Sequence, residues 1–480
     1  MKKNSNITRQ SNLVLGSYYI GKLLHYVNMN LILHSMLSQS QFGLYRGINS
    51  ACFLLANLDL EEAIMRYYPS FSKNKATKAS FWGWSIVANT LLFLGIIVAF
   101  IIMQLVSKNS VSNSAIYHYY PHIFFTGYVI QLAKMLKSWS AVLQRIVWPN
   151  VLQNIVLEIF IGLTLYGYYT HYLSFKVLLL SIAVPYCLHL LFMIFYIGYT
   201  GQVKISFDTN YINKKFIKSF LTYSLFVVVA SKIITLLMRI DSLMLAKLWG
   251  DNVVGKYMHI FGVVLLLDIP YKVSRQSVGP LLAHAFENSN QKEAGYLFRY
   301  AVIRQLLLAS FVLMILYYNM SYFLPTQNQQ EYQYLLCLLG IAKVLNNFFS
   351  IGRILLVLSP YYKLSMIISG LAFINIGINW YIIRLGGLYG AASAILFTML
   401  FLGVATFYLV WYTMRIHPFS WQLLPILTAL FLLIVIEKWI PSRFSVVISC
   451  LRIGIPSVIY GVIYWLNQYV NQHYPTKLSS

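Results

Sequence analysis

The chain has 480 residues, of which 59% are hydrophobic and only 10% are charged, and its mean hydropathy is +0.66. A soluble protein cannot cover its surface with so few charged side chains, so the composition excludes a soluble fold and predicts a polytopic membrane protein. The 36 lysines and arginines outnumber 12 acidic residues. They are scattered between apolar segments and form no polar module, which argues against nucleic acid as a partner.

Apolar runs and the polar segments between them predict an all-α fold with about fourteen transmembrane helices. Each span needs about 20 residues, so little of the chain is left for a soluble domain. The first, second and fourth spans are polar enough for a hydropathy criterion to miss them. In chain order the spans are 12–37, 42–66, 79–106, 116–143, 148–169, 176–200, 216–247, 253–282, 297–324, 331–358, 361–384, 388–414, 421–439 and 445–470.

The lysines and arginines of the connecting segments predict the orientation. If the N-terminus is cytoplasmic, twenty of them fall on the cytoplasmic face and seven on the other. Both termini are therefore expected in the cytoplasm. The N-terminal sequence MKKNSNITRQSN leads into a long helix and has no small-residue cleavage site, so we expect a retained first span rather than a removed signal peptide.

An internal repeat divides the chain near its middle. The first span contains KLLHYVNMNLIL from Lys22 and is followed by FGLYRGI, whereas the seventh contains KIITLLMRIDSL from Lys232 and is followed by VGKYMHI. Duplicated helical bundles are typical of alternating-access transporters. We therefore predict two pseudo-symmetric seven-helix lobes, with an N-terminal lobe at 1–214, the core of the second lobe at 215–415 and a C-terminal helix pair at 416–480.

The sequence contains no motif of an enzyme or of a cofactor site. It has no phosphate-binding GxxxxGK[ST] loop, no HExxH, no nucleophile elbow and no dinucleotide fingerprint,. Four widely spaced cysteines, with no histidine at ligand spacing, predict neither a disulfide nor a metal site. The expected non-cytoplasmic segments are short, so a membrane glycosyltransferase or polymerase with a large external loop is disfavoured. We expect no catalytic residues, no cofactor and no metal.

The informative residues are the charges inside the predicted spans, because an ionisable group at bilayer depth needs a partner or a water-filled cavity. Lys22, Arg46, Lys232 and Arg239 occupy corresponding parts of the two halves. They predict a cationic cavity for an anionic head group, with arginine suited to bidentate phosphate contacts. The alternative is that each base extends to the nearest membrane interface, which we expect for Lys343 and Arg452. Nine bases are assigned to neither membrane face: Lys22, Arg46, Lys134, Lys137, Lys232, Arg239, Lys272, Lys343 and Arg452.

The acidic residues at similar depth have two interpretations each. Glu158 stands alone in an apolar helix, so it is a candidate for protonation-linked transport. The alternative is a hydrogen bond to a neighbour such as Gln153 or to a residue of another helix. Asp241 either pairs with a base of another helix or binds a coupling proton or sodium ion. Asp268 and Lys272 are four residues apart, a spacing that predicts a local ion pair.

Four segments make the chain resemble the Wzx-type polysaccharide and O-antigen repeat-unit flippases, within the multidrug/oligosaccharidyl-lipid/polysaccharide exporter superfamily. They are FGLY after the first span, LDLEEAIMRYYP at the end of the second, RIDSLMLAKLWGDNVVGKY across spans seven and eight, and GGLYGAASAILFTML at the start of the twelfth. The resemblance covers essentially the whole chain.

This resemblance implies a flippase that moves undecaprenyl-diphosphate-linked oligosaccharide from the inner to the outer leaflet by alternating access, for assembly of a surface polysaccharide. It also implies membrane lipids, a polysaccharide polymerase and a chain-length regulator as partners. The basic residues of the family's cavity match Lys22, Arg46, Lys232, Arg239 and Lys272. Two alternatives within the superfamily stay open, a multidrug cation extruder and a flippase of the peptidoglycan precursor lipid II. The excess of bases over acids in the spans disfavours the extruder.

Overall fold

The computed structural model describes residues 2–56, 60–106, 117–208, 214–320, 329–437 and 446–473. Within these ranges the chain forms helices and no strand. Its internal contacts separate an N-terminal unit, Lys2–Val228, from a C-terminal unit that begins at Val229. The division falls inside one continuous helix, α11 (Lys214–Trp249). The lobe boundaries predicted at 214/215 and 415/416 stay predictions.

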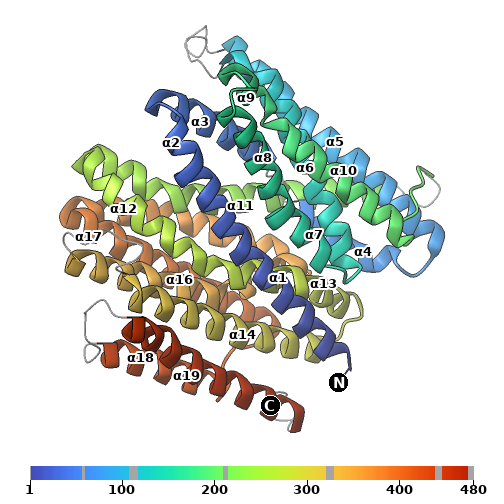
Figure 1. Cartoon of the computed structure of the whole chain (residues 1–480). Coiled ribbons are helices and arrows are strands. Elements are labelled where there is room, and N and C mark those ends of the chain that lie inside the picture. The colour runs from blue at the N-terminus through green and yellow to red at the C-terminus, as the bar shows by residue number, and fades with distance from the viewer. Residues whose placement is uncertain are drawn as a thin grey trace. The chain divides into compact units, whose positions relative to one another are not determined.

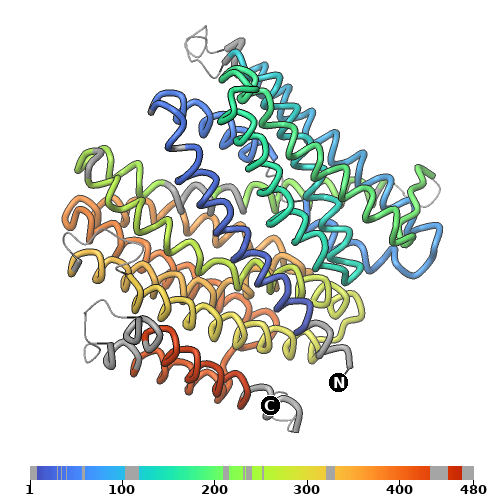
Figure 2. The backbone as a smooth tube through the Cα atoms, in the orientation of Figure 1, coloured from blue at the N-terminus to red at the C-terminus, as the bar shows by residue number. Residues whose placement is uncertain are grey.

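The N-terminal unit contains the first six predicted spans. Figure 2 shows its long helices α5, α6 and α10 running alongside one another. Two spans, the first and the fifth, contain short π-helical segments, η1 and η3. The elements are α1 (Lys2–Tyr26), η1 (Val27–Leu33), α2 (His34–Met36), α3 (Gln39–Leu55), α4 (Leu60–Phe71), α5 (Lys75–Val106), η2 (Tyr117–Tyr119), α6 (Tyr120–Val142), α7 (Val147–Val151), η3 (Leu152–Val156), α8 (Leu157–Tyr169), α9 (Phe175–Ser181) and α10 (Ala183–Thr200).

Local sequence signals set several of these helix ends. The second span begins with a capping box, in which the Ser38 hydroxyl accepts the N–H of Gln41 and the Gln41 side chain accepts the N–H of Ser38. This reciprocal pair satisfies two N–H groups that a helix start otherwise leaves without partners. Ser174 caps α9 in the same way through the N–H of Val177.

Buried apolar side chains from α3, α6, α8, α9 and α10 form the core of the N-terminal unit. Ile48, Cys52, Ile123 and Leu165 are almost completely buried within it. A second group of aromatic rings joins α4, α5 and α6, with Trp82 between Tyr68 and Trp139. In a lipid environment such close packing, rather than water exclusion, holds helices together.

The C-terminal unit contains the remaining predicted spans. In Figure 1 its last two helices, α18 and α19, lie side by side, and both contact α14. The elements after α11 are α12 (Asp251–Val264), η4 (Leu265–Asp268), α13 (Ile269–Glu287), α14 (Gln291–Tyr318), α16 (Gln329–Leu358), η5 (Tyr362–Leu364), α17 (Ser365–Met414), α18 (Leu423–Glu437) and α19 (Val446–His473).

Glycines determine how closely the helices of this unit approach. A Cβ atom on Gly340 of α16 would lie 2.3 Å from Leu313 of α14, and one on Gly403 of α17 would lie 2.2 Å from the Phe349 ring of α16. Small residues at such crossings allow close backbone approach, as is common between membrane helices. Gly387 has a different role, because its φ of 53° and ψ of −125° interrupt α17. The interruption separates two predicted spans, 361–384 and 388–414.

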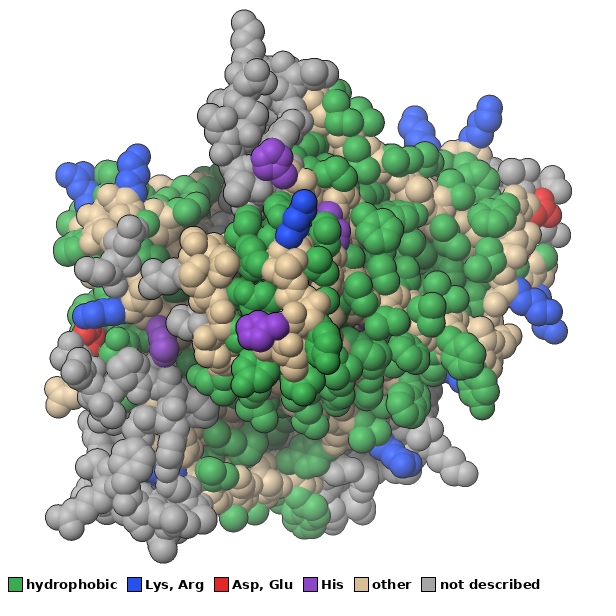
Figure 3. Space-filling model, turned by 45° about the horizontal axis from the view of Figure 1, so that its top comes forward, with side chains coloured by type: hydrophobic (Ala, Val, Ile, Leu, Met, Phe, Trp, Pro, Cys, Tyr) green, Lys and Arg blue, Asp and Glu red, His purple; other side chains and the backbone are tan. Residues whose placement is uncertain are grey.

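Seven segments of the described chain are long and apolar enough to cross a membrane,. None of the seven includes the first, second or fourth predicted span, which agrees with their polar composition. Figure 3 shows one face of the molecule on which hydrophobic side chains cover most of the described surface and acidic side chains are few. The seven segments are Lys75–Ile102, Val147–Tyr169, Phe175–Thr200, Val253–Glu287, Gln291–Tyr318, Gln330–Leu358 and Tyr362–Met414.

Candidate transport site

The predicted cationic residues that the structure describes are exposed on their helices. Lys22 lies on α1, Lys272 on α13, and Arg46 on α3, where its guanidinium is 5.3 Å from the centroid of the Phe42 ring. An exposed base within a span faces either a water-filled cavity or the lipid, where its head must reach the interface. The exposure of these three bases agrees with the predicted water-filled cavity, and it agrees equally with extension to the membrane interface.

Lys232 and Arg239 lie on α11, but their side chains fall outside the described part of the structure. Lys22 and Arg46 belong to the N-terminal unit, and Lys232, Arg239 and Lys272 to the C-terminal unit. Whether these five bases share one cavity therefore stays a prediction.

A stripe of polar and small residues joins the first and fifth spans. We call it the α1–α8 seam and define it by Ser17, Gly21, His25 and Asn28 on one side and Asn154, Glu158 and Gly162 on the other. Its members recur at intervals of three or four residues, so each set lies on one helix face. The spacing is visible in the sequence, but polar residues at such intervals are common, and nothing in the sequence indicates which two helices pair.

Gly21 marks the closest approach in the seam. A Cβ atom at Gly21 would lie 2.4 Å from the backbone oxygen of Asn154, which is closer than real Cβ atoms come. The Asn154 amide donates a hydrogen bond of 3.2 Å to the Ser17 hydroxyl. Asn154 belongs to η3, so a π-helical segment forms one wall of the seam. Such segments are frequent at functional sites in membrane and soluble helices.

Glu158 is the only carboxylate of the seam and lies halfway along the segment Val147–Tyr169. Its Oε1 is 2.9 Å from Nδ1 of His25, and its Oε2 accepts a hydrogen bond of 3.1 Å from the Asn28 amide. Asn28 also donates to the backbone oxygen of Glu158 at 2.8 Å. The expected hydrogen bond of Glu158 to a residue of another helix is confirmed, since His25 and Asn28 of the first span hold its carboxylate. Gln153, the neighbour on the same helix, is not its partner among the described contacts.

Gln153 instead accepts a hydrogen bond from Lys137 of α6. Lys137 is buried, with a relative exposure of 8%, and its ammonium also donates to the Tyr18 hydroxyl at 3.3 Å. Both partners are neutral, and among the described residues no carboxylate forms an ion pair with Lys137. The interior of the N-terminal unit thus contains a positive charge that its direct partners do not compensate. In the sequence, Lys137 is only one more base within a predicted span.

A corresponding polar cluster lies in the C-terminal unit. Asp241 of α11 has a relative exposure of 2%, and its Oδ1 accepts a hydrogen bond of 3.2 Å from the Asn379 amide. Asn379 and Asn375 both donate to the Thr398 hydroxyl, and the Oδ1 atom of Asn375 has no hydrogen-bond partner in the described structure. A buried carboxylate is thus surrounded by amide and hydroxyl groups, and no described base contacts it.

The two clusters occupy equivalent places in the repeat. In the N-terminal unit the carboxylate bond joins the first and fifth spans, and in the C-terminal unit it joins the seventh and eleventh, which are the first and fifth of the second half. The carboxylate lies on different spans in the two halves: Glu158 is on the fifth span of the first half, and Asp241 is on the first span of the second half. This correspondence supports the internal repeat predicted from the sequence.

The predicted local ion pair between Asp268 and Lys272 is wrong. Asp268 pairs with Lys343 of α16, with an Nζ–Oδ2 distance of 2.8 Å, and the Lys343 ammonium also lies 5.3 Å from the centroid of the Phe261 ring. Lys343 is buried, with a relative exposure of 4%. The expectation that its side chain extends to a membrane interface is therefore wrong. Asp268 ends the 3₁₀ segment η4, and this break in the helix turns its side chain away from the i+4 position.

A basic pocket lies where α6 and α9 begin in the N-terminal unit. It is lined by Leu44, His118, Tyr119, Pro121, His122, Lys176 and Leu180, a set with three bases and no acid. Leu44 is two residues from Arg46, on the same helix. This pocket was not expected from the sequence, because Lys176 is more than 50 residues from His118 and His122, and the three form no recognisable motif.

Comparison with solved structures defines the class of the fold. A MATE structure in complex with MaL6 has a TM-score of 0.69 at 14% identity over 85% of this chain and 96% of that chain. A MOP-superfamily transporter from Pyrococcus furiosus, described as having a binding pocket of reversed polarity, gives 0.68 at 14% over 85% and 95%. A mutant of a Vibrio cholerae MATE transporter gives 0.66 at 14% over 86% and 98%. The expected all-α polytopic fold is confirmed, and it is the two-lobed fold of these transporters. The division into seven helices per lobe stays a prediction.

The sequence itself identifies the family. Residues 7–286, more than half of the chain, match the family described as polysaccharide biosynthesis protein. The chain belongs to this family and has the fold of a MOP-superfamily transporter. A search of curated proteins gave no significant match.

Proposed function

We propose that this protein is a flippase for lipid-linked oligosaccharide, which it moves from the inner to the outer leaflet of the bacterial cytoplasmic membrane. One combination carries the proposal, namely membership of a polysaccharide biosynthesis family in a chain folded as a transporter. A transporter that serves polysaccharide assembly has a carbohydrate intermediate as its natural cargo. The lipid carrier we expect is undecaprenyl diphosphate, and a polymerase and a chain-length regulator would act on the delivered glycan.

The charges of the chain support an anionic head group. Lys137 places an uncompensated positive charge inside the N-terminal unit, and the pocket lined by His118, His122 and Lys176 contains no acid. We propose that Lys22, Arg46, Lys232, Arg239 and Lys272 hold the diphosphate in an aqueous cavity, with the two arginines making bidentate contacts. The glycan would occupy the cavity while the lipid tail stays in the bilayer. A cationic drug would be repelled by such a lining, which disfavours a multidrug extruder.

Removing either arginine should reduce flipping to below about one tenth, because a charged hydrogen bond contributes roughly 1.5–3 kcal/mol. The measurement uses a strain that lacks the gene and follows lipid-linked glycan and its access to a glycosidase added outside. The gene with Arg46→Ala or Arg239→Ala should leave protected glycan in the inner leaflet. Arg384→Ala is the matched control, since Arg384 also lies over an aromatic ring, Trp380, at 5.2 Å. Normal flipping by both variants at wild-type expression would refute the assignment.

We further propose that Asp241 binds the coupling cation and that Glu158 takes part in protonation-linked movement of the seam. Asp241 accepts one hydrogen bond in the described structure, from Asn379, and a carboxylate can accept about four,. Its neighbours Asn375 and Thr398 offer the oxygen atoms that hard cations prefer,. A proton or a sodium ion would complete this site, whereas Glu158 already has two partners.

Asp241→Asn should therefore remove the dependence of transport on an ion gradient and lower its rate about tenfold or more, because the buried negative charge is lost. Flipping is measured in proteoliposomes while the sodium gradient or the proton gradient is collapsed separately. Glu158→Gln is the comparison: it removes a protonatable group of the seam, so it should weaken a response to the proton gradient and leave a response to the sodium gradient unchanged. If Asp241→Asn responds to both gradients as the wild type does, Asp241 is not the coupling site.

A further inference from the structure

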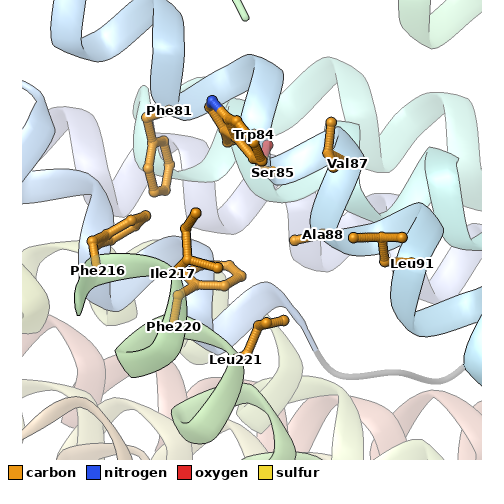
Figure 4. Close-up of a pocket in the computed structure, with 10 residues that line it drawn as sticks. All are labelled: Phe81, Trp84, Ser85, Val87, Ala88, Leu91, Phe216, Ile217, Phe220 and Leu221. Atoms are coloured by element: carbon orange, nitrogen blue, oxygen red, sulfur yellow. The ribbon is translucent and has the colours of Figure 1, made fainter. Parts of the chain in front are cut away.

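An apolar groove runs between α5 and the first turns of α11, within the N-terminal unit. Figure 4 shows side chains of the two helices facing a common space. About 430 Å³ of this space is free of protein atoms. The lining residues are Phe81, Trp84, Ser85, Val87, Ala88 and Leu91 of α5 and Phe216, Ile217, Phe220 and Leu221 of α11.

The groove offers a ligand almost no hydrogen-bonding groups. Its one hydroxyl, on Ser85, donates to the backbone oxygen of Trp82 at 2.8 Å and accepts the indole N–H of Trp139 at 3.2 Å. The other lining side chains are hydrocarbon or aromatic, and the one further polar atom among them is the indole Nε1 of Trp84, a buried donor with no hydrogen-bond partner in the described structure. A ligand that fits must therefore itself be hydrocarbon where it lies in the groove, because a buried polar group without a partner is costly.

The aromatic walls of the groove are held in place by a ring cluster at one end. The Phe71 ring lies 5.3 Å from Phe81 and 4.7 Å from Phe216, and the Tyr67 ring lies 5.5 Å from Phe216. The Tyr67 hydroxyl is also 2.9 Å from the Ser219 hydroxyl of α11. These contacts fix the wall rings before a ligand arrives, which reduces the entropy that binding costs.

The α5 wall of the groove has the length of one leaflet of a bilayer, whereas the α11 wall, 216–221, rises about 7.5 Å,. From Phe81 to Leu91 the helix rises about 15 Å, at 1.5 Å per residue. The hydrocarbon core of a bilayer is about 30 Å thick, so one leaflet is about 15 Å deep. The groove lies in the apolar segment Lys75–Ile102, beginning six residues from its start. It therefore spans the acyl region of the leaflet next to the lysines that precede it.

Positive charges gather where the groove begins. Lys78 precedes Phe81 by three residues, and Lys214 precedes Ile217 by three, so each lies one turn before the lining,. Lys75 and Lys218 are exposed nearby. Across the described segments 72–91, 201–208 and 214–221 the single acid is Asp208. The Lys78 ammonium lies 6.0 Å from the centroid of the Tyr68 ring, and the exposed side chains of Lys75, Lys214 and Lys218 extend into the surroundings.

We propose that this groove binds a phospholipid with an anionic head group, one acyl chain lying between α5 and α11 and the phosphate at Lys78 and Lys214. The lysines select the charge, and the single-leaflet depth selects a diacyl lipid over a polyprenyl carrier, whose chain is far longer than the groove. The site is separate from the proposed diphosphate site and does not depend on the transported substrate. It assigns a structural or regulatory lipid to the N-terminal unit.

The test uses the full chain in nanodiscs with phosphatidylglycerol that carries a photoreactive group near the middle of an acyl chain. After illumination, the cross-linked peptides are identified by mass spectrometry. We expect labelling on the lining residues of α5 and α11, competed by unlabelled phosphatidylglycerol and about 25-fold less well by phosphatidylcholine, since each lysine near a lipid surface contributes a factor of about five. Equal competition by the two lipids, or labelling spread over all lipid-facing helices, would overturn the proposal.

Variants locate the lipid within the groove. Ala88→Trp should fill it and lower labelling about tenfold, because blocking two methylene positions is enough for that factor. Ala99→Trp is the matched control, the same change eleven residues further along the same helix, at an exposed position beyond the groove. Lys78→Gln with Lys214→Gln should remove the preference for phosphatidylglycerol. Equal labelling of Ala88→Trp and Ala99→Trp would overturn the proposal, as would stronger labelling by a photoreactive polyprenyl phosphate, which would identify a carrier lipid instead.

Discussion

Replacing Lys343 by methionine should destabilise the C-terminal unit by about 3–5 kcal/mol, the usual cost of removing one partner of a buried ion pair. Lys343 is almost completely buried and is 2.8 Å from Asp268, so the change would leave a carboxylate without its counter-charge. The measurement is the free energy of unfolding in lipid or mild detergent, followed by denaturant titration.

Two variants test this explanation. Asp268→Leu combined with Lys343→Met should recover most of the loss, because an apolar pair of similar volume is often as stable as an ion pair. Lys256→Met is the matched control. Lys256 is 3.8 Å from Glu331, and both side chains are partly exposed, so its loss should cost at most about 1 kcal/mol. A similar loss for Lys256→Met and Lys343→Met would show that burial of the pair is unimportant.

Replacing Gly21 by leucine should open the α1–α8 seam and cost about 3 kcal/mol or more, at the upper end for overpacking. The added side chain would meet the backbone of Asn154, which cannot rotate away as a flexible side chain could. Moving α1 to make room would also separate His25 and Asn28 from Glu158. Stability is measured as above, and the seam is followed by a cross-link between cysteines placed at Ser17 and Asn154.

Gly16→Leu is the control for this experiment. Gly16 is on the same helix, and a Cβ atom there would meet nothing within 4 Å. The helix-propensity gain from replacing glycine is the same at both sites. Only Gly21→Leu should lose stability and cross-linking efficiency. Equal behaviour of the two variants would mean that the close approach at Gly21 is not important for the seam.

The helices of the fold could be predicted from the sequence, because apolar runs and their polar interruptions have the length that a bilayer requires. Even the break between spans eleven and twelve was expected at its place, and Gly387 supplies it. In the described chain, the first, second and fourth predicted spans contain no apolar segment that a hydropathy criterion finds, and the seventh, thirteenth and fourteenth contain only shorter ones. Polar side chains within a bundle lower mean hydropathy without preventing insertion, provided that other helices satisfy them.

Partners across helices could not be predicted in the same way. Asp268 and Lys272 have the spacing of a local pair, yet Asp268 bonds to a residue 75 positions away because η4 interrupts the helix. Glu158 was a lone carboxylate in the sequence, and its bonds to His25 and Asn28 depend on which helices are neighbours. Spacing predicts contacts within a helix, whereas contacts between helices need the tertiary fold.

The candidate site could likewise be predicted from the sequence only in part. The sequence indicated an excess of bases in the spans and two acids of interest, and the structure describes the surroundings of both acids. Lys137 was one base among nine until its burial and its neutral partners distinguished it. Whether the five proposed cavity bases converge remains a prediction for the arginine variants to test.

The reversal at Gly387 has a consequence for biosynthesis. Spans eleven and twelve are joined without a hydrophilic loop, and a Cβ atom at Gly390 would already lie 2.5 Å from the backbone oxygen of Ile382. The Asn375 and Asn379 amides of the first helix donate to the Thr398 hydroxyl of the second, so the first helix lacks these partners until the second lies beside it,. We therefore expect the two to leave the translocon together as one unit, and a chain truncated at Gly386 to be retained and degraded although its eleventh span is intact.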